Sequence, residues 1–179
     1  KPNITFATNL IKKILSAVSY LHSLDTPIIH SDITPLNIML DMSSGMLEPI
    51  LIDFGLSKHK SYSTSYNSSV PSIFYCAPEL FNGEHSVKSD IFSLGALYYS
   101  LIEGYFPWHN KFNINDINSV DFQDKIISNR NSKLTFTTIN AIDETIKLSI
   151  IKSLLPEPET RFESVDDFYK SITKEKLIS

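Results

Sequence analysis

Cysteine is nearly absent from this sequence, since Cys76 is the single one among 179 residues. One cysteine cannot form a disulfide within the chain, and this usage fits a reducing compartment. Positive charge is also scarce, because 16 Lys and Arg residues stand against 20 Asp and Glu residues, which gives a formal net charge of −4. This balance predicts no basic face, so we expect neither nucleic acid nor an anionic membrane as a partner.

Long hydrophobic runs are missing as well. The best stretch, residues 91–102, is interrupted by Ser93, Gly95 and Ser100, so no membrane-spanning segment is expected. The start shows no secretory pattern, and because residue 1 is Lys rather than Met, we expect the chain to be part of something longer. What remains is an ordinary globular composition, 42% hydrophobic and 20% charged, which predicts one domain with a real core.

Helical spacing is the main structural signal. Helices are predicted over residues 6–22, 88–103, 116–128 and 141–155, with a last one beginning at 164–170. Gly104 is expected to end the second helix, and Ser164 to cap the last. Two short β-type runs, residues 37–40 and 50–52, flank a turn at Ser44 and Gly45 and predict a two-stranded hairpin. Residues 57–69 are almost all polar and predict a mobile loop.

Oxygen-bearing side chains lie on both sides of the predicted hairpin. The segment His30–Asn37 comes just before its first strand, and the segment Asp53–Gly55 comes just after its second. Asp32, Asn37 and Asp53 should therefore lie at one end of the hairpin. Carboxylate and amide oxygens suit Mg²⁺ held together with phosphates, and a carboxylate free of the metal can accept a proton from a hydroxyl nucleophile. Each segment alone is a weak signal, because a lone Asp-Phe-Gly is more often a turn after a strand and His-x-Asp also fits a capped loop.

These two segments resemble the catalytic loop and the Asp-Phe-Gly motif of protein kinases. The resemblance implies that Asp32 is the catalytic base, and that Asn37 and Asp53 are magnesium ligands at the ATP site. Met39 falls where the family places the apolar floor under the adenine ring. Three further residues match positions that are structural in the family, beneath the site: His30, Phe54 and Gly55.

Four segments farther along the chain resemble the same family in the same order. Ala77-Pro78-Glu79 is similar to the end of the activation segment, and residues 104–108 are similar to the segment that follows the central helix. Asp90 begins a segment that resembles the start of that helix, where the family uses the Asp to support the catalytic-loop backbone. Arg161 stands where the family keeps an Arg that pairs with the Glu of Ala-Pro-Glu, here Glu79.

Three positions bear on activity and specificity. Ser31 replaces the usual Arg, which in the family binds a phosphorylated residue of the activation loop. Thr34 replaces the Lys that approaches the transferred phosphate, a change that weakens electrostatic stabilisation of the transition state. Ser72 keeps a hydroxyl where the family contacts the catalytic base, which favours serine and threonine substrates. Thr34 and Ser72 are therefore the residues expected to position the substrate.

The resemblance implies a mainly α fold of the α+β family, in which residues 1–179 form the C-terminal lobe of a protein kinase domain with a short β-hairpin at the catalytic cleft. The N-terminal lobe and the hinge would lie outside the chain, so the fragment alone should be inactive. The full-length protein would be an ATP- and Mg²⁺-dependent serine/threonine kinase, acting on a protein substrate under a possible regulatory protein. We expect an intracellular location, cytoplasmic or nuclear.

Two other functions compete with this interpretation. A pseudokinase, which binds proteins without useful turnover, is favoured by Thr34 and Ser31 and opposed by the intact Asp32, Asn37 and Asp53. A small-molecule phosphotransferase of the kinase-like fold would share the catalytic-loop pattern. Such relatives lack the Ala-Pro-Glu segment, the Asp90 segment and the Glu79–Arg161 pairing, which count against that function here.

Overall fold

The computed structural model describes residues 3–43, 45–53, 72–113, 119, 121–137 and 142–173. Within these residues the α-helices are α1 (Ile4–His22), α2 (Val87–Glu103), α3 (Phe122–Arg130), α4 (Glu144–Ser153) and α5 (Val165–Thr173). The strands are β1 (Ile38–Asp41) and β2 (Glu48–Leu51). The predicted mainly helical fold with one hairpin is confirmed. Residues 54–71, which include the predicted loop at 57–69, lie outside the described part of the chain.

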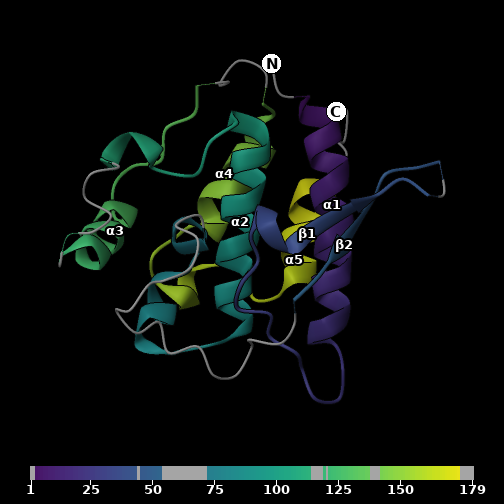
Figure 1. Ribbon diagram of the computed structural model, residues 1–179, viewed down its shortest axis with the longest axis horizontal. Coiled ribbons are helices and arrows are strands. Elements are labelled where there is room, and N and C mark those ends of the chain that lie inside the picture. The colour runs from purple at the N-terminus through teal and green to yellow at the C-terminus, as the bar shows by residue number, and fades with distance from the viewer. Residues whose placement is uncertain are drawn as a thin grey trace, which may run out of the picture.

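Helix α2 is the central element, with α1, α4 and α5 packed around it (Figure 1). It is apolar on nearly all sides, and most of its residues are buried. Ser86 caps its start, accepting a hydrogen bond from the Ser89 backbone N–H and donating its own N–H to the Ser89 hydroxyl. Gly104 ends it with a φ of 84°, a left-handed conformation that glycine adopts without steric cost, as the sequence predicted.

Helix α1 buries one face against this core. Its inward residues recur at helical spacing and are all buried: Ala7, Leu10, Ile11, Ile14, Leu15 and Val18. Asn3 caps the start, where its side-chain oxygen accepts the Phe6 N–H at 3.0 Å. On the outer side, Lys13 donates to the Leu47 carbonyl at 2.9 Å and to the Glu48 carboxylate at 2.6 Å. Because both acceptors belong to the hairpin, α1 fixes the position of β2.

Strands β1 and β2 pair in antiparallel register, from Ile38 opposite Leu51 to Asp41 opposite Glu48. Gly45, in the connection between them, has a φ of 78°, which the predicted turn requires. The hairpin crosses α1 on its outer side and extends beyond it (Figure 1). Hydrophobic side chains on the hairpin and in the turn before it remain exposed: Leu36, Met39, Leu40, Met42, Met46 and Ile50 are each at least 40% exposed.

The third and fourth helices differ from their predicted bounds. The helix predicted over 116–128 begins only at Phe122 in the described residues and continues to Arg130, because Asp121 and Ser119 form a turn and a bend. Phe122 and Ile126 are its buried anchors. Helix α4 begins after Asp143, whose side chain accepts the Thr145 N–H at 2.8 Å. In the described part of the chain, no helix is long and apolar enough to cross a membrane.

Candidate active site

Asp32 and Asn37 are joined directly. The Asn37 side-chain Nδ2 donates to the Asp32 backbone carbonyl at 2.8 Å and to its Oδ2 at 3.0 Å. Pro35 makes this possible, since its fixed φ starts the short 3-10 turn Pro35–Asn37 that brings the two side chains together. Because Nδ2 is used by Asp32, the amide oxygen of Asn37 is the atom of this side chain that can serve as a metal ligand.

Asp53 lies at the same end of the hairpin. The Ile52 N–H donates to the Asn37 carbonyl at 2.9 Å, so Asp53 follows one residue beyond a contact with Asn37. Asp53 is exposed and has a φ of 65°, a left-handed conformation that costs a non-glycine residue about 1–2 kcal/mol and is concentrated at functional sites. The expected convergence of these three residues at one end of the hairpin agrees with the hydrogen bonds.

The donor set of this cluster is two carboxylates and an amide oxygen. In the part of the chain that the structure describes, no group of three or more His, Cys, Asp and Glu side chains is placed to hold a metal ion. The donors of Asp32, Asn37 and Asp53 are all oxygens, which suit zinc and other metals that prefer imidazole or thiolate ligands poorly. Mg²⁺ fits them well, because it binds through one or two carboxylates and completes its shell with water and phosphate oxygens.

Asp90, at the start of α2, supports the backbone just before Asp32. Its carboxylate is fully buried, and it accepts the His30 N–H at 2.9 Å on Oδ2 and the Ser31 N–H at 2.8 Å on Oδ1. His22, at the end of α1, adds its Nε2 at 2.8 Å from Oδ2. The contact that the resemblance implied for Asp90 is thus present, and it ties the loop that begins at His30 to the central helix.

His30 connects the loop to β2. The Asp32 N–H donates to Nδ1 of His30 at 3.3 Å, so Nδ1 carries the lone pair and Nε2 carries the hydrogen. That Nε2 lies 3.2 Å from the carbonyl of Ile52, the residue before Asp53. One buried imidazole therefore contacts both the backbone of Asp32 and the residue before Asp53, and so helps to set the distance between these two segments. The residues predicted beside His30, Phe54 and Gly55, lie outside the described part of the chain.

Ser31 has a second partner that the sequence did not indicate. Its hydroxyl lies 2.8 Å from Nδ1 of His85, a residue 54 positions away in the connection between the Pro78–Asn82 turn and α2. Ser31 is buried and has a φ of 64°. His85 belongs to no motif and follows no periodic pattern, so no signal in the sequence could have identified it.

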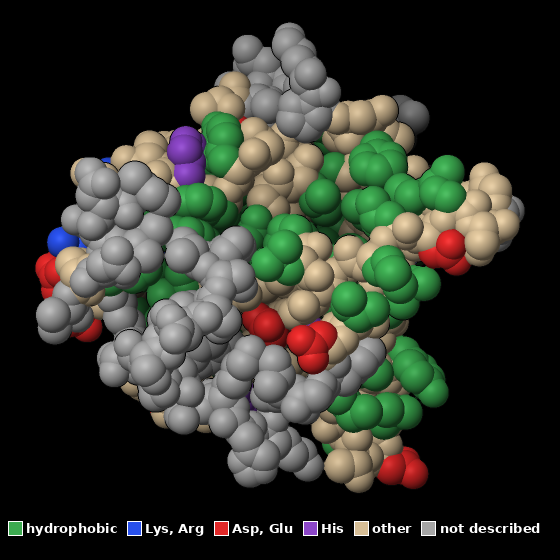
Figure 2. All heavy atoms as spheres, in the orientation of Figure 1, with side chains coloured by type: hydrophobic (Ala, Val, Ile, Leu, Met, Phe, Trp, Pro, Cys, Tyr) green, Lys and Arg blue, Asp and Glu red, His purple; other side chains and the backbone are tan. Residues whose placement is uncertain are grey.

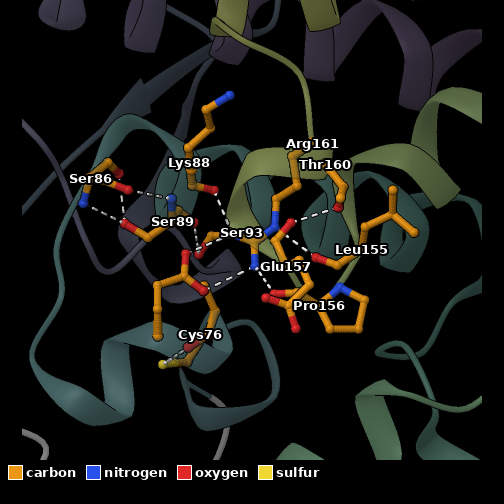
Figure 3. Close-up of polar contacts among 12 residues, drawn as sticks. Cys76, Ser86, Lys88, Ser89, Ser93, Leu155, Pro156, Glu157, Thr160 and Arg161 are labelled. Atoms are coloured by element: carbon orange, nitrogen blue, oxygen red, sulfur yellow. Dashed lines mark hydrogen bonds and ion pairs between the residues drawn. The ribbon is translucent and has the colours of Figure 1, made fainter.

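Arg161 and Glu79 form the expected ion pair, and Figure 3 shows the Arg161 side chain among Lys88, Leu155 and Pro156. Nη1 and Nη2 of Arg161 donate to the two carboxylate oxygens at 2.6 and 2.9 Å. The guanidinium also donates to three backbone carbonyls, those of Leu155, Lys88 and Pro156. Since this side chain is fully buried, these bonds use its donors completely and anchor Glu79 against the end of α4.

The segment that holds Ser72 is fixed by aromatic packing. Ser72 is half-buried and opens a short 3-10 turn with Ile73 and Phe74. The Phe74 ring stacks on Phe106 with centroids 3.9 Å apart. Arg130, at the end of α3, donates to the Ile73 carbonyl at 2.8 Å. Like His85, Arg130 was not identified from the sequence, because nothing in its neighbourhood marks it.

The two remaining candidates differ in exposure. Met39 is 51% exposed and faces the same side as Ile50, its partner on β2. Thr34 is 1% exposed, and its hydroxyl has no hydrogen-bond partner among the described residues. Thr34 is therefore a buried polar group beside Asp32 rather than an open surface position.

Comparison with known proteins gives a consistent result. The family model of the protein kinase domain matches residues 4–173. A probable serine/threonine-protein kinase, samkB of Dictyostelium discoideum, is 43% identical over 109 residues, which cover 59% of this chain and 18% of that protein. Calcium-dependent protein kinase 4 of Plasmodium falciparum is 36% identical over 112 residues, covering 60% of this chain and 21% of that protein.

A third relative is myosin light chain kinase A of Dictyostelium discoideum, which is 38% identical over 104 residues, or 58% of this chain and 35% of that protein. The chain therefore spans between about a fifth and about a third of the length of these curated relatives.

Proposed function

The chain belongs to the protein kinase domain family, and from this premise we propose that the full-length protein transfers the γ-phosphate of ATP to serine or threonine hydroxyls of protein substrates. The observation that carries the proposal is the Asn37 hydrogen bond to the Asp32 carboxylate, at the end of the hairpin where Asp53 follows. This geometry leaves one oriented carboxylate as a proton acceptor beside a set of hard oxygen ligands.

Each residue has a separate role in this reaction. Asp53 and the amide oxygen of Asn37 would hold Mg²⁺, which supplies positive charge beside the phosphates. Asp32 orients the substrate hydroxyl and takes its proton while the oxygen bonds to the γ-phosphorus and the bond to the β-phosphate oxygen breaks, so that ADP leaves. Asp90 and His30 keep Asp32 in position through the backbone of the loop. Ser72, which is half-buried, would contact the substrate, whereas the buried Thr34 hydroxyl would reach it only if the loop around it opened.

The second part of the proposal is that residues 1–179 are the C-terminal lobe of the kinase domain. The exposed hydrophobic side chains of the hairpin support this assignment, because apolar side chains gathered at a surface mark a region that another body covers (Figure 2). Met39 would lie beneath the adenine ring, and the neighbouring side chains would contact an N-terminal lobe outside this chain. A protein kinase needs both lobes to enclose ATP, so activity belongs to the full-length protein.

Substrate class and location complete the proposal. Ser72 supports serine and threonine substrates, and the names of the relatives agree with that choice. The protein substrate and a regulatory protein would be its partners, inside the cytoplasm or the nucleus, where ATP is present.

The test is phosphorylation of a generic basic protein by the full-length protein with Mg·ATP, beside its Asp53→Ala variant. Transfer that is abolished by Asp53→Ala supports the proposal. Asp41→Ala is the matched control, because Asp41 lies on the same hairpin and its carboxylate binds Ser43 instead. Transfer by neither protein, while Mg·ATP still raises the parent's melting temperature, would indicate a nucleotide-binding pseudokinase.

A further inference from the structure

We propose that His85 is a positioning residue for the phosphoryl transfer, because its hydrogen bond to the Ser31 hydroxyl holds the loop backbone that presents Asp32. The inference rests on the proposed function, since it assigns a role at the same site. Its basis is the 2.8 Å contact between His85 Nδ1 and Ser31 Oγ, which joins the connection before α2 to the catalytic loop.

The conformation of Ser31 explains why this contact matters. A φ of 64° places Ser31 in the left-handed region, which is sterically unfavourable for a residue with a Cβ. Such a conformation persists only where surrounding contacts hold it. The backbone N–H of Ser31 is held by Asp90 Oδ1 at 2.8 Å, and the side chain is held by His85. The two contacts come from opposite ends of the residue and together fix its backbone and its rotamer.

The strained residue immediately precedes Asp32. The peptide that joins them carries the Asp32 N–H, which donates to His30 Nδ1 at 3.3 Å. If Ser31 relaxed toward an ordinary φ, this peptide would rotate and the Asp32 carboxylate would move away from Asn37. His85 therefore acts on the reaction through Ser31 and does not touch the reacting atoms.

The burial of the two partners makes the bond worth more than a surface contact. Ser31 is 4% exposed and His85 is half-buried, so water competes weakly for the hydroxyl. The hydrogen-bonding atom is Nδ1, the ring nitrogen nearer the backbone. The amide group of an Asn side chain reaches about the same place, whereas the amide of Gln reaches the place of Nε2. These two substitutions therefore form a matched pair.

The experiment measures kcat and KM of full-length His85→Leu, His85→Asn and His85→Gln. We expect kcat about 3- to 10-fold lower in His85→Leu and His85→Gln, the range for loss of one neutral hydrogen bond, with KM for ATP unchanged. His85→Asn should recover most of the parent kcat. Ser31→Ala should lower kcat by a similar factor, and His85→Leu should add little to it, because both changes remove the same bond.

A purely structural role gives different results. It would lower the melting temperature of His85→Leu and leave kcat per folded molecule at the parent value, which overturns the proposal. Equal losses in His85→Asn and His85→Leu would overturn it as well.

Hydrogen exchange separates this inference from the proposed function. If the parent itself transfers no phosphate, the proposed function fails. The positioning contact is then judged by the Ser31 and Asp32 amides, which should exchange faster in His85→Leu than in His85→Asn. Equal exchange in those two variants would contradict the contact.

Discussion

Arg161 and Glu79 lie 82 positions apart, yet their side chains meet in a two-bond ion pair, with Nη1–Oε1 at 2.6 Å and Nη2–Oε2 at 2.9 Å. The Arg161 side chain is 0% exposed and that of Glu79 is 8% exposed. A buried pair of this kind contributes little net free energy, but removal of one partner leaves a charge in a poorly solvated place. The pair therefore makes the packing of Glu79 against α4 and α2 sensitive to single substitutions.

Arg161→Ala should lower the free energy of unfolding by about 3–5 kcal/mol, because Glu79 keeps its charge and loses its partner. Thermal and urea unfolding measure this loss. Lys170→Ala is the control, since Lys170 pairs with Asp166 at the surface and such pairs contribute about 0.2–1 kcal/mol. An unchanged melting curve for Arg161→Ala would be incompatible with the buried pair.

Asp32→Asn should reduce the turnover of the full-length protein by roughly 10²–10⁴-fold, the usual contribution of a positioned general base. The amide has nearly the shape of the carboxylate, so the loop should stay folded and the loss should appear in kcat. Phosphorylation of a generic basic protein at saturating ATP measures it. A variant as active as the parent would remove Asp32 from the mechanism, whereas an equal melting temperature would show that the loss is chemical.

Asp90→Asn should loosen the catalytic loop. The two carboxylate oxygens of Asp90 accept the N–H groups of His30 and Ser31, one each. An amide keeps only one accepting oxygen, so at least one N–H group that now binds this side chain would face an NH₂ group. The expected loss is about 1–3 kcal/mol of unfolding free energy, with faster hydrogen exchange at those two amides. Asp25→Asn removes the same charge from an exposed position and should change neither quantity. Protected amides in Asp90→Asn would refute the role given to this carboxylate.

The sequence predicted most of the fold because its helices are long and strongly periodic. Helix α1 and helix α2 begin and end within about two residues of their predicted bounds. Their buried faces and their caps depend on residue types close together in the sequence, which a local pattern can detect. The helix over 116–128 was the weakest pattern, and its start is wrong. In that helix the residues around Phe122 and Ile126 are mostly polar, and the burial of these two side chains determines where the helix forms.

The candidate site could be predicted only for residues that lie close together along the chain. Asp32, Asn37 and Asp53 flank a hairpin, so their convergence follows from the chain itself. His85 and Arg130 reach the site from positions 54 and 57 residues away from their partners, and no spacing rule relates such distant residues. Their contacts are set by how α2 and α3 pack, which is a property of the folded chain.

Gly95 shows the same limit inside a helix. In the sequence it is only a weak helix former between Leu94 and Ala96. In the structure it is the point where α2 approaches α4, since a Cβ at Gly95 would collide with the Ser153 hydroxyl and lie 2.8 Å from the Ser153 Cβ. Glycine is required there by the neighbouring helix, not by backbone conformation.

Gly95→Ala should therefore destabilise the protein by about 1–3 kcal/mol through overpacking, although alanine is the better helix former by about 1 kcal/mol. Urea unfolding measures the difference. Adding Ser153→Ala removes the hydroxyl and should recover part of the loss, with Ser153→Ala alone as the reference. A Gly95→Ala protein at least as stable as the parent would mean that α4 can move away freely.

Tyr98 links α2 to α1 and should give the protein a specific alkaline response. Its hydroxyl lies 2.8 Å from Thr8 Oγ1, and because that Thr8 hydroxyl already donates to the Ile4 carbonyl, Tyr98 is the donor. Burial raises the pKa of Tyr98 from 10.0 to about 12. The folded state therefore keeps this phenol neutral at a pH where the unfolded chain ionises it.

The sign of the effect follows from that pKa difference. Stability from the neutral phenol is fully present below pH 10 and is lost as the pH rises to about 12, because only the unfolded state releases the proton in that window. Tyr98→Phe cannot show this loss. Urea unfolding of both proteins should give a constant difference up to pH 9 or so, set by one hydrogen bond of about 1 kcal/mol, and a difference that shrinks above pH 10. A difference independent of pH would mean that Tyr98 ionises as readily in the folded chain as in the unfolded one.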